Sequence, residues 1–208
     1  SVEHIAKALD RIEKFVNKIV NKQLEKDIIS KEDANIYKYG YILMCEVLIN
    51  ICIALVIAAV STEWLLISMF LIIYIPLRSY CGGWHANKLW KCTIYSNLII
   101  LVMLIGSKYM LDAVSCMMFL TIFLTCSGII IFIAPIDTTA KPISIDEKKA
   151  YRSKIKVIIL LHFCAFVWML LKNEKAIMYV IDFSYITQTI MLFLEMTARR
   201  LSNTRIKN

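Results

Sequence analysis

The sequence predicts an all-α, polytopic membrane protein with about six transmembrane helices and an amphipathic N-terminal helix. Three observations lead to this prediction: 59% of the 208 residues are hydrophobic, only 19% are charged, and the apolar residues gather in long stretches. Soluble domains average about half apolar and about a quarter charged residues. A soluble protein of this size could not bury so many apolar side chains. With five glycines and three prolines, the chain is also unlike disordered or collagen-like sequences.

Residues 1–35 form the first predicted element. Apolar side chains recur there at steps of three and four, with seven basic and seven acidic residues between them. This spacing predicts an amphipathic cytoplasmic helix that does not span the bilayer. Its apolar stripe would either lie in the headgroup plane or pack on the rest of the protein. Because the segment has no continuous apolar run, we expect no cleavable secretory signal in it.

Six apolar stretches follow within residues 36–198, and most approach the roughly 20 residues that cross a bilayer core. They lie at residues 39–60, 64–77, 93–111, 114–134, 155–171 and 176–198. The second stretch has only 14 residues, which rise about 21 Å as a helix, and Pro76 stands near its end. We therefore expect this span to stop short of the far interface. A basic tail, residues 199–208, follows the last span.

Basic residues in the connections predict the orientation of these spans. With six spans, 21 of the 24 lysines and arginines fall before the first span, in connections 78–92 and 135–156, or in the tail. Lys108, Lys172 and Lys175 fall on the opposite side. We therefore expect a multi-pass cell-membrane protein with both termini in the cytoplasm. This distribution also argues that the net charge of +8 orients the chain and does not bind nucleic acid.

The seven cysteines do not predict a disulfide framework. Their number is odd, and five of them lie inside apolar stretches, where each behaves as a small buried hydrophobic residue. Only Cys81 and Cys92 lie in or beside a polar connection. A thiol at that position fits the reducing cytoplasmic side of the membrane.

The connection 78–92 holds the residues that could carry chemistry. Gly82 and Gly83 precede His85, and Cys92 follows seven residues later. A histidine can take the proton of a thiol, and the resulting imidazolium stabilises the thiolate, so this pair suffices for acyl transfer. Seven residues of straight helix would separate the two by about 10.5 Å along the axis. The chain therefore has to bend between them, and the two glycines permit such a bend.

Other interpretations of this connection stay open at this point. Cys81, four residues before His85, is a competing thiol. Cys81, His85 and Cys92 could also bind zinc, although the spacing is irregular and no fourth ligand is evident, so we expect no metal. The amides of Gly82 and Gly83 could form an oxyanion-binding nest or simply a turn. The histidine and cysteines could equally be interfacial and packing residues.

Arg78, Gly82-Gly83, His85 and Cys92 resemble the Arg-x(3 or 4)-Gly-Gly-x-His-Ala-x(6)-Cys pattern of the accessory gene regulator B family. Members of this family are membrane peptidases of peptide quorum sensing in Gram-positive bacteria. The resemblance extends to chain length, the amphipathic start, the hydrophobic plan and the basic connection before the fifth span. It implies that Cys92 is the nucleophile and His85 its base, with the arginine and the glycines as supporting positions and without a cofactor.

The same resemblance implies the substrate. It is a short AgrD-like propeptide with an amphipathic leader, a middle segment that becomes the signal, and a charged C-terminal tail. The enzyme removes the tail and closes the middle segment into a thiolactone or lactone ring. The enrichment of basic residues in cytoplasmic connections is enough to explain Lys141, Lys148, Lys149 and Arg152. These side chains could also attract the acidic tail of the propeptide. Membrane lipid is the other expected partner, and we leave the oligomeric state open between monomer and homodimer.

A different class of function also fits the composition. A small transporter or channel for a peptide or an ion would use polar groups inside the spans to line its path. Such groups are available in Glu46, Lys108, Asp182 and Glu195. A scaffolding subunit is a third class, and it would form no covalent adduct with a substrate.

Single-cysteine accessibility labelling tests the orientation. Cysteines placed in 78–91 and 135–156 should react only with reagents that reach the cytoplasmic side, because basic connections stay in the cytoplasm. Cysteines placed at 172–175 should react from outside. If position 85 were exposed only to the outside, the interpretation as a propeptide peptidase would be wrong, since a cytoplasmic propeptide could not reach it.

Overall fold

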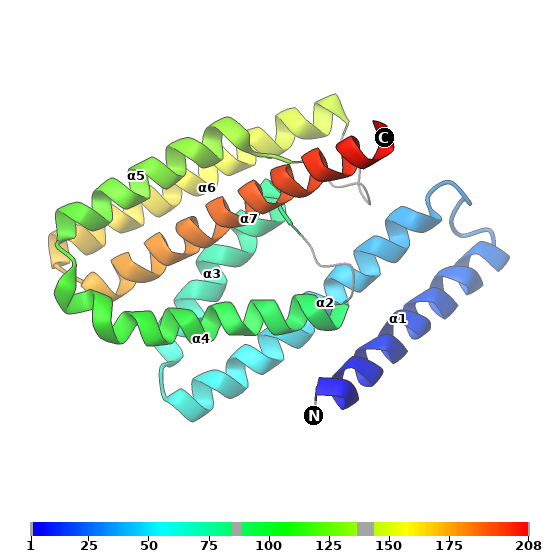
Figure 1. Ribbon diagram of the computed structural model, residues 1–208, viewed down its shortest axis with the longest axis horizontal. Coiled ribbons are helices and arrows are strands. Elements are labelled where there is room, and N and C mark those ends of the chain that lie inside the picture. Colours follow the sequence, from blue (N-terminus) through cyan, green and yellow to red (C-terminus); the bar gives the residue numbers. More distant parts are fainter. Residues whose placement is uncertain (1, 85–88, 137–143, 208) are drawn as a thin grey trace.

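The computed structural model of the protein describes residues 2–84, 89–136 and 144–207. Within these ranges the chain forms seven helices and no strand (Figure 1). They are α1 Val2–Glu25, α2 Ala34–Ser61, α3 Trp64–Cys81, α4 Leu89–Ala113, α5 Cys116–Ile133, α6 Ile145–Lys172 and α7 Lys175–Lys207. Six helices, α2 to α7, are long and apolar enough to cross a membrane. The all-α class and the predicted number of spans are confirmed.

Capping residues explain why α6 begins earlier than the apolar stretch 155–171. The Ser144 hydroxyl accepts from the Glu147 backbone at 3.3 Å, and the Glu147 carboxylate accepts from the Ser144 backbone at 2.9 Å. This capping box satisfies amides that the first turn leaves without intrahelical partners. The basic residues at 148–156, predicted to lie in a connection, are consequently helical. Asn173, in the left-handed conformation with φ 58°, ends the helix.

Helix α3 is longer than predicted. It continues through Pro76 to Cys81, so its 18 residues rise about 27 Å. Proline removes one backbone hydrogen bond, but neighbouring helices can compensate in a membrane bundle. Leu77 and Cys81, on the turns beyond the proline, are both fully buried against them. The helix is therefore longer than the apolar stretch 64–77, and Arg78 stands on it. Its rise is still slightly less than a bilayer core of about 30 Å, so the expectation that this span stops short of the far interface stays a prediction.

Helix α7 lies at the centre of the bundle and contacts α3, α4, α5 and α6. Figure 1 shows α5, α6 and α7 side by side, with α2 and α4 forming the other half of the bundle. An aromatic cluster joins the first three: Phe123 packs on Tyr185 and Phe166, with ring centroids 4.7 and 5.1 Å apart. The central helix is thereby fixed against its neighbours over much of its length.

Helix α1 packs along α2 (Figure 1). Val16 and Val20, on the apolar stripe of α1, are buried against Tyr41 and other residues of α2. Gln23 also donates a hydrogen bond of 2.9 Å to the Tyr41 hydroxyl. Protein therefore covers part of this stripe, while Phe15 on the same stripe is 63% exposed. Whether the helix also lies in the headgroup plane stays a prediction.

Candidate active site

The chain leaves α3 through two glycines with positive φ. Gly82 has φ 71° and Gly83 has φ 128°, both in regions that residues with a side chain rarely adopt. The Gly82 amide still donates to the carbonyl of Arg78 at 3.2 Å. The two glycines therefore end α3 at Cys81 and turn the chain away from the helix axis directly after it.

Both glycines are also in close contact with neighbouring groups. A Cβ on Gly82 would lie 2.5 Å from the carbonyl oxygen of Ile136, which belongs to the chain after α5. A Cβ on Gly83 would overlap the guanidinium of Arg78 and lie 3.2 Å from the carbonyl oxygen of Met191. The glycines are needed here for space as well as for backbone conformation.

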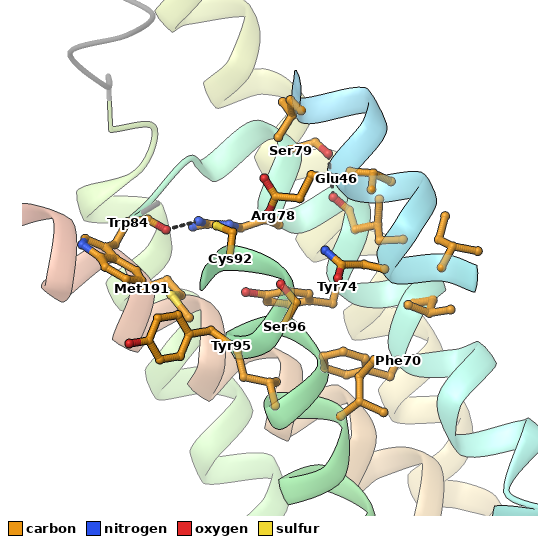
Figure 2. A pocket seen from close by; sticks show the side chains of 18 of the residues that line it. Glu46, Phe70, Tyr74, Arg78, Ser79, Trp84, Cys92, Tyr95, Ser96 and Met191 are labelled. Atoms are coloured by element: carbon orange, nitrogen blue, oxygen red, sulfur yellow. Dashed lines mark hydrogen bonds between the residues drawn. The ribbon is translucent and has the colours of Figure 1, made fainter. Parts of the chain in front are cut away.

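The Arg78 side chain holds this turn by hydrogen bonds to the carbonyl groups of the turn. Its Nη1 donates to the carbonyl of Gly82 at 2.9 Å, and its Nη2 donates to the carbonyl of Trp84 (Figure 2). A planar guanidinium suits two acceptors held in a fixed arrangement. Of the residues that the sequence grouped as supporting positions, Arg78, Gly82 and Gly83 are thus brought together.

Helix α7 holds the same turn from the opposite side. The Gln188 side chain donates to the carbonyl of Gly82 at 2.8 Å, and the Trp84 amide donates to the carbonyl of Met191 at 3.0 Å. The Ile136 amide adds a bond of 3.0 Å to the carbonyl of Cys81. Gln188 was not identified from the sequence. The one feature that could have drawn attention to it is that it is a polar residue within the apolar stretch 176–198.

A cavity of about 190 Å³ lies beside this turn, among α2, α3 and α4. Cys92, on the first turns of α4, lines it and is 9% exposed (Figure 2). Cys81 is fully buried and does not line it. The structure therefore gives the two candidate thiols different surroundings, and only that of Cys92 opens onto a space that a substrate could enter. The polar lining includes Tyr39, Glu46, Asn50, Tyr74, Arg78, Ser79, Cys92, Tyr95 and Ser96.

Glu46 meets Cys92 across this cavity. The carboxylate, on α2 and 9% exposed, is hydrogen-bonded to the Cys92 side chain. The charge of Arg78 is close enough to act on the same carboxylate. One helical turn further along, Asn97 of α4 donates to Asn50 of α2 at 3.0 Å. Two polar contacts thus fix α2 against α4 at the cavity.

These groups together suit nucleophilic acyl transfer. A thiol that lines a recess can reach a carbonyl carbon, and a neighbouring carboxylate can accept its proton. The lining is otherwise mostly apolar. The sequence singled out Cys92 but gave Glu46 no role in this chemistry, although an acidic residue within an apolar span was the signal that could have found it.

His85 and Lys141 lie outside the described residues, and so does the zinc alternative, which depends on His85. Within the described ranges, no three His, Cys, Asp or Glu side chains group as in a metal site. Lys148 is half-buried on the first turns of α6. Lys149 and Arg152 are exposed there.

The polar residues proposed for a transport path do not share one. Glu46 lines the cavity, whereas Glu195 accepts a hydrogen bond of 3.0 Å from Arg199 on its own helix. Asp182 is 2% exposed inside the bundle, and Lys108 is exposed on the outside of α4. Of these four residues, only Glu46 lines the cavity beside the turn.

Comparison with known proteins gives a consistent result. The family model described as Accessory gene regulator B matches residues 12–192. The chain is 31% identical over 162 residues to AgrB-like protein 2 of Clostridium perfringens strain 13, covering 73% of this chain and 72% of that protein. It is 29% identical, with the same coverage, to an AgrB-like protein of C. perfringens strain SM101. No solved structure matches.

Substitution of the glycines tests the geometry of the turn. Gly82→Ala and Gly83→Ala should each destabilise the protein by at least about 1–3 kcal/mol, the usual cost of such backbone conformations before any clash is added. Gly40→Ala and Gly128→Ala are matched controls, because a Cβ there meets nothing within 4 Å. The measurement is the temperature at which the purified protein in detergent loses its folded, monodisperse form. Equal melting temperatures for all four variants would contradict the described packing.

Proposed function

This chain belongs to the accessory gene regulator B family, whose members process autoinducer propeptides in quorum sensing, and we propose that it does so as a membrane cysteine endopeptidase. Cys92 is the nucleophile, and His85 supplies acid–base catalysis. The observation that carries the proposal is that Cys92, and not Cys81, lines the cavity between α2, α3 and α4. The protein is proposed to lie in the cell membrane of a Gram-positive bacterium, with both termini in the cytoplasm.

The proposed reaction has two acyl-transfer steps. The Cys92 sulfur attacks the carbonyl that precedes the charged tail of the propeptide, the C–N bond breaks, and the tail leaves as an amine that takes up a proton. The product of this step is a thioester between the peptide and Cys92. A thiol or hydroxyl within the peptide then attacks the thioester, releases Cys92 and closes a thiolactone or lactone ring.

Exclusion of water favours ring closure over hydrolysis. The cavity has a mostly apolar lining, and Cys92 is only 9% exposed. Trp84 and Tyr95, with ring centroids 5.7 Å apart, cover one side of it. A thioester formed in this recess would meet the peptide's own nucleophile at a high effective concentration, while bulk water would have little access.

Substrate binding is proposed to use charge as well as the membrane surface. The amphipathic leader would bind in the headgroup plane. Lys148, Lys149 and Arg152, together with Lys141, would attract the acidic tail. The start of α6 is close to the end of α3, since Lys154 lies 4.9 Å from the centroid of the Tyr80 ring. A tail held there would bring the scissile bond toward the cavity.

Substitution of the proposed catalytic residues tests the nucleophile. Cys92→Ala and His85→Ala should each abolish cleavage of a test propeptide that has an amphipathic leader, an internal cysteine and an acidic tail. Cys81→Ala should retain appreciable activity, because that thiol does not line the cavity. The measurement is release of the tail in membrane vesicles containing equal amounts of each variant. An inactive Cys81→Ala together with an active Cys92→Ala would show that the nucleophile is misassigned.

A propeptide without its ring-forming cysteine tests the two-step reaction. Replacing that cysteine by alanine leaves tail removal possible but removes the nucleophile that releases Cys92. The expected result is a trapped thioester, seen as a mass increase of the enzyme that hydroxylamine reverses and that Cys92→Ala prevents. Rapid release of a linear peptide acid, with no adduct at any time, would show instead that water reaches the cavity freely.

A further inference from the structure

Glu46 is an acidic residue in the middle of a membrane-spanning helix. It belongs to α2 and is 9% exposed. Ionisable residues within spans are costly and usually serve a function with a specific partner. A neutral glutamine would accept a hydrogen bond at lower cost. The presence of a carboxyl group therefore points to a use for its ionisation.

The partner of this carboxylate is the proposed nucleophile. Glu46 is hydrogen-bonded to the Cys92 side chain, and both line the same cavity. The other charged or titratable groups of the lining are Tyr39 of α2, Tyr74 and Arg78 of α3, and Tyr95 of α4. Helix α7 contributes only Met191 to this lining.

A proton shift between Glu46 and Cys92 keeps the negative charge inside the cavity that Arg78 lines. When the thiol proton moves along the hydrogen bond, one negative charge passes from the carboxylate to the sulfur, and no new charge is created in the apolar recess. The guanidinium acts on the carboxylate and lines the cavity with both groups. It can attract the negative charge in either position.

We infer that Glu46 is a catalytic residue that accepts the Cys92 proton when the thiol attacks the propeptide and returns it when the thiol is released. This inference rests on the proposed function, from which it takes Cys92 as the nucleophile. It departs from the role of base for Cys92 that the family resemblance implies for His85, and divides acid–base catalysis between two residues. Glu46 serves the enzyme's thiol, and His85 serves the groups of the peptide.

The first step starts with Cys92 as the thiol, Glu46 as the carboxylate and His85 as the imidazolium. The S–H proton of Cys92 moves to the Glu46 carboxylate as the C–S bond forms and the carbonyl π electrons move to oxygen. When the tetrahedral intermediate collapses, the C–N bond breaks and the departing amine takes a proton from the imidazolium of His85. The enzyme then holds a thioester, a neutral carboxyl group and a neutral imidazole.

The second step restores the starting state. The internal thiol of the peptide gives its proton to His85 and attacks the thioester carbonyl. The bond to Cys92 breaks, its electron pair stays on the sulfur, and the carboxyl group of Glu46 returns the proton. No proton has to come from bulk water in either step, which suits a recess from which water is excluded.

Substitution of Glu46 tests the inference with the test propeptide and its variant that lacks the ring-forming cysteine. Glu46→Gln keeps the shape and an acceptor oxygen but cannot take the proton. Its single-turnover rate of thioester formation at pH 7 should fall about 100-fold, the lower range of general-base contributions, with little change in the propeptide concentration giving half the maximal rate. Because solvent base removes the thiol proton at high pH, the deficit should shrink steadily between pH 7 and pH 9.

Two further variants serve as comparison. Glu46→Asp keeps a carboxylate and should be clearly faster than Glu46→Gln at pH 7. Glu195→Gln is the matched control, because that carboxylate is bonded to Arg199 on its own helix, and it should react at the wild-type rate. All variants are compared at equal amounts in the membrane, and the melting temperature of each purified variant in detergent verifies that its fold is intact.

The outcomes separate this inference from the proposed function. Cleavage by Cys92→Ala would contradict the proposed function itself. With Cys92→Ala inactive, a wild-type rate for Glu46→Gln would overturn the role of Glu46 and leave the nucleophile in place. A deficit that stays constant across the pH range, or an aspartate variant no faster than the glutamine variant, would reduce Glu46 to a residue that only positions the thiol.

Discussion

The bidentate hydrogen bonding of Arg78 to the turn that follows its own helix is the contact on which the site depends. A chain that leaves a helix inside a membrane bundle exposes carbonyl groups that water cannot satisfy. The guanidinium satisfies those of Gly82 and Trp84, while it stays close to the carboxylate of Glu46. One side chain thus fixes the turn and supplies the positive charge of the cavity. Lysine could not do both, because its ammonium group lacks the planar pair of donors.

The central helix extends this constraint to the whole bundle. Helix α7 donates to the turn through Gln188 and accepts from it through the carbonyl of Met191. The same helix carries Tyr185, whose ring packs on Phe123 of α5 at 4.7 Å and whose hydroxyl lies 3.0 Å from His162 of α6. A change in the packing of α5 and α6 would therefore reach the turn through α7. The position of the turn is a property of the complete bundle and not of the connection alone.

The proposed reaction places two conflicting requirements on the cavity. A reactive thioester lasts longer where water is scarce, but acid–base chemistry needs polar groups that an apolar medium penalises. The structure limits this penalty by pairing the polar groups across helices: Glu46 with Cys92, and Asn50 with Asn97 at 3.0 Å. Both pairs join α2 to α4, so the same contacts that pair these polar groups also hold the two walls of the cavity together. Packing and chemistry are coupled at this point.

The sequence by itself determined the class and the number of spans, and it singled out the segment with the proposed nucleophile, because these depend on local composition and on a short motif. Tertiary structure alone decided that α3 continues through Pro76, since burial of the following turns compensates for the lost backbone bond. It also decided that Glu46 meets Cys92 and that Gln188 reaches Gly82. The sequence shows that a polar residue lies within a span, but it does not show which neighbouring helix that residue contacts. That choice is made by the packing of helices far apart in the chain, which no local pattern contains.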